Sequence, residues 1–119
     1  MHRVLIIDDN NAFRAAARQL LERGAFIVVA EAESGTDAVE DAKAHRPDLA
    51  LVDLQLPDFD GFEVAERLSR LDPAPKVILT SSLDGSDFGA LVTSSSALGF
   101  IPKAELSAHA IDALLTQTP

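Results

Sequence analysis

The fold is decided by residues 3–24, which read RVLIIDDNNAFRAAARQLLERG. The β-favouring run Arg3 to Ile7 ends at an acidic pair, Asp8 and Asp9. Apolar residues at helical spacing follow, and they stop before Gly24, a residue type that often ends helices. This stretch therefore predicts a strand followed directly by a helix.

The same alternation of strand and helix continues through the rest of the chain. Four further apolar runs predict strands: Phe26 to Ala30, Leu49 to Val52, Lys76 to Leu79 and Phe100 to Pro102. Helical patterns separate them, which is typical of a parallel sheet wrapped by helices. Because Pro102 has no backbone N–H, we expect the last strand at an edge of the sheet.

Several residues indicate where the helices begin and which faces they bury. Ser34 with Asp37 predicts a capped helix start, and Ser107 can cap the last helix. The third helix is expected to bury one face, made of Val64, Ala65, Leu68 and Leu71. The fourth is expected to be short or mobile, since its apolar face consists of Phe88, Leu91 and Val92 among Gly and Ser.

Composition narrows the class of protein. The chain has 119 residues, no cysteine, and 10 Lys and Arg against 19 Asp and Glu, a formal net charge of −9. One domain spanning residues 1–119 is expected at this length. The lack of cysteine excludes disulfides and thiolate sites, and the acidic balance argues against binding nucleic acid through this chain alone. No apolar run approaches the ~20 residues that cross a bilayer, so we expect a cytoplasmic protein without a membrane contact.

Polar residues with chemical potential stand where the predicted strands end. They are Asp8, Asp9, Asp53, Thr80 and Lys103. The carboxyl ends of parallel strands lie along one edge of a sheet, where ligands of open α/β sheets collect. We therefore expect five residues that are distant in sequence to meet at one rim.

Three carboxylates in one cleft predict a cation. At ~4 Å, two unit charges repel by about 4 kcal/mol at an effective dielectric constant near 20. Oxygen ligands in an incomplete cage suit Mg²⁺ better than zinc or a buried calcium. One carboxylate can then act as a nucleophile towards a phosphoryl group, while Lys103 offsets charge on its oxygens and Thr80 donates a hydrogen bond to it.

Four motifs together resemble a known family. They are Asp8-Asp9, DLQLPDFDG at residues 53–61, VILTS at 77–81 and GFIPK at 99–103. In this order they are similar to the receiver domain of bacterial two-component response regulators, and the resemblance covers essentially the whole chain. It implies a single doubly wound, flavodoxin-like α/β domain, with a five-stranded parallel sheet of order 2-1-3-4-5 flanked by five helices.

The resemblance also implies a role for each residue at a matching position. Asp53 matches the phosphoacceptor, Asp9 a direct Mg²⁺ ligand and Asp8 a ligand acting through water. The main-chain carbonyl of Gln55 matches the group that completes the metal site.

Three more positions match the part of the family's site that contacts the phosphate. Thr80 and Lys103 match the phosphate-contacting pair, and Phe100 matches an aromatic residue that changes rotamer as the Thr hydroxyl moves. One position departs from the family pattern, which commonly has Pro after the Lys with a cis bond between them. This chain has Ala104, which leaves the isomer of the Lys103–Ala104 bond open.

The function implied is a phosphoacceptor switch and not an enzyme. Asp53 would accept a phosphoryl group from a sensor histidine kinase or a phosphotransfer protein in a Mg²⁺-dependent reaction. The phosphorylated domain would then act on a downstream output protein, or on an output domain that follows in a longer chain.

Two other functions stay open at this point. A metal-dependent phosphatase of the haloacid dehalogenase type also uses an Asp nucleophile at a strand end, but that family requires Asp two residues later, where this chain has Gln55. The second alternative is a receiver fold that binds a partner without being phosphorylated. Plainer roles are helix capping for Asp8 and Asp9, or for Asn10 and Asn11, and core packing for Phe100.

Overall fold

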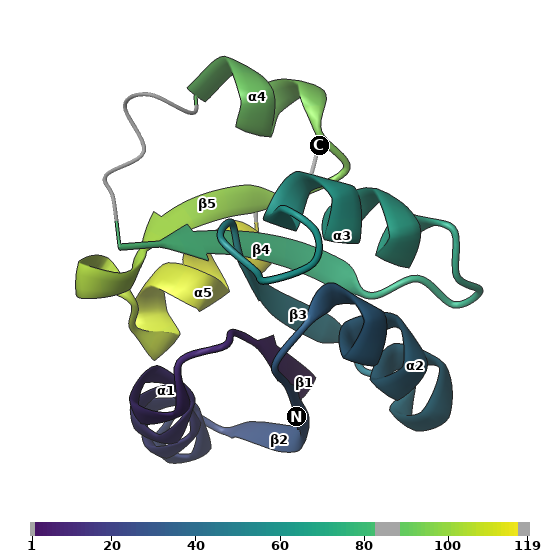
Figure 1. Cartoon of the computed structure of the whole chain (residues 1–119). Helices are drawn as coiled ribbons and strands as arrows, with labels where there is room; N and C mark the ends of the chain where they lie inside the picture. Colours follow the sequence, from purple (N-terminus) through teal and green to yellow (C-terminus); the bar gives the residue numbers. More distant parts are fainter. Residues whose placement is uncertain (1, 83–88, 117–119) are drawn as a thin grey trace.

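The computed structural model describes residues 2–82 and 89–116. Strands and helices alternate along the described chain (Figure 1), in the order β1 (His2–Ile7), α1 (Asn11–Arg23), β2 (Phe26–Ala32), α2 (Gly35–His45), β3 (Leu49–Asp53), α3 (Gly61–Ser69), β4 (Lys76–Ser81), α4 (Gly89–Ser94), β5 (Gly99–Pro102), the 3-10 turn η2 (Lys103–Glu105) and α5 (Ala108–Leu115).

The strands form one parallel sheet of order β2-β1-β3-β4-β5, which confirms the expected fold class. The register places Ile7 of β1 beside Val52 of β3, and Asp53 beside Thr80 of β4. Strand β5 lies at an edge, as Pro102 predicted. This topology brings the carboxyl ends of β1, β3, β4 and β5 to one rim of the sheet.

Helices cover both faces of the sheet (Figure 1). One layer of core packs α1 and α5 on the sheet, with Leu21 and Ile111 fully buried. The other packs α2 and α3 on the opposite face, with Leu68 fully buried. All five residues of β3 are buried, as expected for a central strand covered on both sides. Burying each large aliphatic side chain contributes roughly 2 kcal/mol, so the central strands are the most strongly held part of the rim.

Side-chain caps set the starts of four helices. In each case the cap side chain accepts a hydrogen bond from the backbone N–H three residues later; the caps are Asn10, Ser34, Asp60 and Ser107. The caps at Ser34 and Ser107 were predicted. At α1 the cap is Asn10, so neither Asp8 nor Asp9 is used for that purpose.

The structure corrects two expectations about helix faces. Leu71 lies beyond the end of α3, which stops at Ser69 because the chain turns there towards Pro73 and Pro75. Leu91 is 54% exposed, since α4 has six residues and buries none of them. The prediction of a short fourth helix is confirmed for Gly89–Ser94, while Phe88 lies outside the described residues.

Within residues 2–82 and 89–116, no helix has the length and apolar character needed to span a bilayer.

Candidate functional site

The carboxyl rim of the sheet gathers the acidic residues. Asp8 follows β1, Asp53 is the last residue of β3, and Asp9 begins the loop to α1. One carboxylate oxygen from each of the three lies within 4.8 Å of the others. Asp8 is fully buried, Asp53 is 5% exposed, and Asp9 faces solvent. The strand ends thus bring the three carboxylates together.

The two carboxylate oxygens of Asp8 have different neighbours. Oδ1 accepts a hydrogen bond from the backbone N–H of Asn10 at 2.9 Å. Oδ2 is buried and lies 2.6 Å from Lys103 Nζ as an ion pair. Three carboxylates against one ammonium group leave an excess of negative charge, which fits a hard divalent cation.

Lys103 brings positive charge directly beside the carboxylates of Asp8 and Asp53. Its Nζ lies 3.4 Å from Asp53 Oδ2 as well as 2.6 Å from Asp8 Oδ2, and 4.4 Å from the centre of the Phe13 ring. Burial opposes the charge, but the hydrogen bond to Asp8 and the charges of Asp53 and Asp8 together raise the pKa of Lys103. The ammonium group therefore stays protonated beside the two carboxylates.

The Lys103–Ala104 bond is trans, since the cis bond among the described residues joins Asp72 and Pro73. The loop after β5 thus presents its lysine without the cis proline that the family commonly has.

Asp53 ionises less readily than a free aspartate. Burial, and then the negative charge of Asp8, raise the pKa of Asp53. The backbone N–H of Gln55, which donates to Asp53 Oδ1 at 3.1 Å, and the ammonium of Lys103 act in the opposite direction but do not cancel the rise. An added cation would lower this cost and favour the carboxylate form, which is the nucleophilic one.

The loop from Asp53 to α3 is held against the rim. Gln55 pairs with Asp60 in an isolated antiparallel bridge, and Gly61 donates its N–H to the Leu54 carbonyl at 3.0 Å. A Cβ on Gly61 would lie 2.7 Å from the Asp53 carbonyl oxygen, so this close approach requires glycine. The structure places Gln55 directly beside the acidic residues, and the metal-binding role of its carbonyl remains a prediction.

Thr80 lies on β4, the strand next to Asp53, and Phe100 lies on β5, the strand beyond it. Thr80 is buried, pairs in register with Asp53, and accepts the Leu54 N–H at its carbonyl. Phe100 is half-buried beside Leu79 and packs against the core layer under α2 and α3. The packing role of Phe100 is thus present, and the role of both residues in a switch remains a prediction.

Two residues that the sequence analysis did not single out support this rim. The buried Arg14 donates from its guanidinium to the main-chain carbonyl of Asp8. Asp58, in the loop after β3, accepts hydrogen bonds from the backbone N–H groups of Gly35 and Thr36 at the start of α2. Arg14 shares a helical face with Ala17 and Leu21, so a charged residue in an apolar stripe was the available signal. Asp58 had none, because its partners are 22 and 23 residues away.

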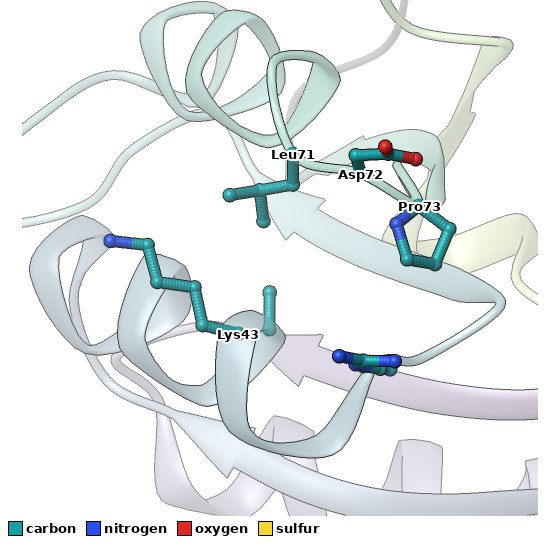
Figure 2. A pocket seen from close by; sticks show the side chains of 6 residues that line it. Lys43, Leu71, Asp72 and Pro73 are labelled. Atoms are coloured by element: carbon teal, nitrogen blue, oxygen red, sulfur yellow. The ribbon is translucent and has the colours of Figure 1, made fainter.

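A surface pocket of about 220 Å³ lies away from this rim (Figure 2). It opens between the end of α2 and the turn before β4, and it is lined by Ala42, Lys43, Arg46, Leu71, Asp72 and Pro73. These segments belong to the amino ends of the strands, so the pocket shares no residue with the acidic cluster.

Comparison with known proteins identifies the family. The family model described as response regulator receiver domain matches residues 4–115. A Pseudomonas aeruginosa protein named as a transcriptional regulator is 39% identical over 105 residues, which cover 88% of this chain and 51% of that protein. The chemotaxis protein CheY of Bacillus subtilis is 38% identical over 82 residues, 69% of this chain and 68% of CheY.

Solved structures agree with these sequence matches. A LuxR-family two-component response regulator from Aurantimonas sp. superposes with a TM-score of 0.86 at 30% identity, over 97% of this chain and 85% of that one. This chain spans about half the length of the Pseudomonas relative, and its fold, its motifs and the family match agree along the same residues. The chain belongs to the response regulator receiver domain family.

Proposed function

We propose that this domain is a phosphorylation switch in which Asp53 accepts a phosphoryl group in a Mg²⁺-dependent reaction. The observation that carries the proposal is the cluster of three carboxylates at the strand ends, of which the two buried ones, Asp8 and Asp53, are paired with Lys103. The three negative charges exceed the positive charge of Lys103, and a divalent cation would offset the excess.

Asp8, Asp9 and Asp53, with the main-chain carbonyl of Gln55, are the groups that would hold the metal ion. A bound Mg²⁺ would supply positive charge that offsets the three carboxylates and the incoming phosphoryl oxygens. The donor set is oxygen throughout, and Asp9 lies at the solvent side of the cluster, which fits an ion that keeps part of its water shell.

Asp53 performs the covalent step. A carboxylate oxygen of Asp53 forms a bond to phosphorus while the bond from phosphorus to the donor nitrogen of a phosphohistidine breaks, and the electron pair of that bond stays on the nitrogen. The product is an acyl phosphate on Asp53. Lys103 Nζ, which lies 3.4 Å from Asp53, would neutralise charge on the transferred group, and the hydroxyl of Thr80, which pairs in register with Asp53 on the adjacent strand, would donate to it.

Phosphorylation would be read out through β4 and the edge strand β5, which lie on one side of Asp53. New contacts of the phosphate with Thr80 and Lys103 would bias the positions of Thr80 and Phe100, and so the surface formed by α4, β5 and α5. The proposed phosphodonor is a sensor histidine kinase or a phosphotransfer protein. The proposed receiver of the signal is a downstream protein, or an output domain in a longer chain, since this chain matches about half of its Pseudomonas relative.

Intact-protein mass spectrometry after incubation with acetyl phosphate or phosphoramidate and Mg²⁺ tests the proposal. We expect one added phosphate on the wild-type chain, none on Asp53→Asn, and none when EDTA replaces Mg²⁺. Asp112→Asn, which changes an exposed aspartate of α5, serves as the matched control and should be modified like the wild type.

Three results would contradict the proposal. Label that persists on Asp53→Asn would place the acceptor elsewhere. Rapid release of inorganic phosphate from a small phosphoester would instead favour the haloacid dehalogenase type of chemistry. A folded wild-type chain that takes no phosphate and binds no Mg²⁺ would indicate a receiver fold used as a binding module.

A further inference from the structure

Arg14 is an unusual residue for the apolar face of a helix. It lies on α1 with Ala17 and Leu21, and these three are the buried residues of that helix. Its side chain is 9% exposed. A buried guanidinium group loses several kcal/mol of hydration, and an apolar side chain would pack at this place without that loss. Packing alone therefore does not explain why an arginine occupies position 14.

The guanidinium group uses each of its nitrogens. Nη1 donates to the main-chain carbonyl of Asp8, and Nη2 donates to Asn11 Oδ1. Nε donates to Glu31 Oε1 at 3.0 Å, and Nη2 also lies 3.3 Å from Glu33 Oε1. Two glutamates, one on β2 and one in the loop after it, thus hold the guanidinium group on one side. Its Nη1 points at the end of β1.

The carbonyl that Arg14 binds belongs to the peptide joining Asp8 to Asp9. The N–H of Asp8 is already fixed, since it donates to the Ala32 carbonyl at 3.0 Å. With both its N–H and its carbonyl bound, Asp8 has its backbone set on both sides. The direction of the Asp9 side chain then follows from the same peptide, because rotating that peptide would break the bond to Arg14.

We propose that Arg14 is a positioning residue that orients the Asp8–Asp9 peptide so that both carboxylates converge on a divalent cation. The inference rests on the proposed function, since it assigns a role to Arg14 in binding the same ion. Arg14 does not touch the ion, and it acts through the main chain that carries two of its ligands.

The sign of the effect on Mg²⁺ binding separates positioning from simple electrostatics. Arg14 is a cation close to a cation site, so its charge alone repels Mg²⁺. Removing that charge should strengthen binding if charge is all that matters. If Arg14 orients the peptide, its loss weakens binding despite the relief of repulsion.

Three variants test this by calorimetric titration with Mg²⁺ alone. Arg14→Gln removes the charge and the fork, and Arg14→Lys keeps the charge but loses the fork geometry. Arg18→Gln is the matched control, because Arg18 also binds Glu31, at 2.8 Å, whereas the hydrogen bond to the Asp8 carbonyl comes from Arg14. Thermal unfolding of each variant in EDTA records any loss of stability separately.

We expect both Arg14 variants to raise the Mg²⁺ dissociation constant by about tenfold, the scale seen when a partner of a metal ligand is removed, and Arg18→Gln to change it by less than about twofold. The phosphorylation rate at saturating Mg²⁺ should recover towards the wild-type rate. The backbone amide resonance of Asn10, which donates to Asp8, should shift in both Arg14 variants and stay in place in Arg18→Gln.

The outcomes are distinguishable. Arg14→Gln or Arg14→Lys that folds and binds Mg²⁺ as tightly as the wild type, or more tightly, overturns the positioning role and leaves the proposed function intact. If Arg14→Gln does not fold, Arg14→Lys decides by the same criterion. A folded wild-type chain that binds no Mg²⁺ overturns the proposed metal site and this inference with it.

Discussion

The surroundings of Asp53 disfavour its negatively charged form. Burial and the charge of Asp8 raise the pKa of Asp53 above its ordinary value of 3.8, so the ionised side chain destabilises the folded state relative to the unfolded chain. As the pH rises from 3.8 through the folded-state pKa, Asp53 keeps its proton longer in the folded state than in the unfolded chain. Stability therefore falls with rising pH, and the cost is complete above the folded-state pKa.

Asp53→Asn should for this reason be more stable than the wild type in EDTA at neutral pH, by a few degrees in the melting temperature. The difference should shrink as the pH is lowered and should vanish well below 3.8, where both the folded and unfolded forms carry the proton. Thermal unfolding from neutral to acid pH measures it, with Asp112→Asn as the control. An Asp53→Asn variant that melts below the wild type at neutral pH would contradict this account of the site.

Lys103 offsets the charges of Asp8 and Asp53 where no metal is added. Lys103→Met should lower the free energy of unfolding in EDTA by about 2 kcal/mol, between the values for exposed and fully buried pairs. Because the pKa of Lys103 is raised, its contribution is present below the ordinary value of 10.5 and is lost as the pH rises through the folded-state pKa.

Mg²⁺ should recover part of the stability lost in Lys103→Met, and should bind that variant more tightly, since a competing cation has been removed. Urea unfolding with and without Mg²⁺ measures both effects. Lys76→Met, at the exposed start of β4, is the control for losing any lysine. Equal losses in the two variants would show that Lys103 carries no special share of the site.

At this scale, the sequence predicted the residues of the rim but not their supports. Asp8, Asp53 and Thr80 follow from one rule, that parallel strands end at the same edge. Arg14 was missed because sequence alone does not show which carbonyl a buried arginine reaches. The ion pair between Asp8 Oδ2 and Lys103 Nζ also needs coordinates, since it depends on where the loop after β5 carries the ammonium group.

Among the elements, the loop after β3 and the start of α2 behave as one unit. Asp58 accepts from the Gly35 N–H at 2.8 Å, and from the Thr36 N–H and hydroxyl at 2.9 and 2.8 Å. Desolvation acts to raise the pKa of Asp58, but these hydrogen bonds together outweigh it and lower the pKa to about 2. Asp58 thus satisfies helix N–H groups that the Ser34 cap leaves open, and it joins α2 to the loop that carries Gln55.

Asp58→Ala should lower the free energy of unfolding by about 1 kcal/mol, the usual scale for a lost helix cap. The folded-state pKa is depressed, so this stability is present above 3.8 and is lost as the pH falls towards about 2. Urea unfolding at neutral pH and near pH 2 should show the gap between wild type and variant closing. A gap that persists in acid would mean that packing, and not the carboxylate, holds the loop.

Two glycines at helix starts give a matched pair of substitutions. A Cβ on Gly61 of α3 would lie 2.7 Å from the Asp53 carbonyl oxygen and 2.8 Å from the Leu54 Cα, both of which are backbone atoms. Gly61→Ala should therefore destabilise the fold by about 1–3 kcal/mol. A Cβ on Gly89 of α4 meets no atom within 4 Å, so Gly89→Ala should be neutral or stabilise by up to ~1 kcal/mol. Chemical unfolding of both variants measures the contrast, and similar losses would contradict the crowding at Gly61.

The strands were located from the sequence to within two residues at each end. Strand β3 was expected from Leu49 to Val52, a continuous apolar run typical of a buried central strand, and it extends one residue further, to Asp53. The end of α3 and the exposure of Leu91 were not predictable in the same way. Both depend on how far the neighbouring elements reach over each helix, which is a property of the assembled layers.

For the molecule as a whole, the net charge of −9 and the acidic rim should affect stability differently when salt is added. Any salt screens the general repulsion among exposed carboxylates, whereas a specific site responds to one ion. Binding that favours the folded state adds RT ln(1 + [L]/Kd), about 1.4 kcal/mol at ten times the dissociation constant. A domain of this size should then melt several degrees higher in Mg²⁺ than in NaCl of the same ionic strength.

Melting curves in Mg²⁺ and in NaCl matched for ionic strength separate general charge screening from specific binding of Mg²⁺. We expect the extra rise in Mg²⁺ to be lost in Asp9→Asn, which removes a carboxylate of the trio at its exposed side and leaves the buried pair with Lys103 in place. Asp112→Asn lowers the net negative charge by the same amount and should keep the full Mg²⁺ effect. Equal melting temperatures in the two salts for the wild type would mean that the rim responds to Mg²⁺ only as any acidic surface does, because a specific ion must stabilise the fold beyond its ionic strength.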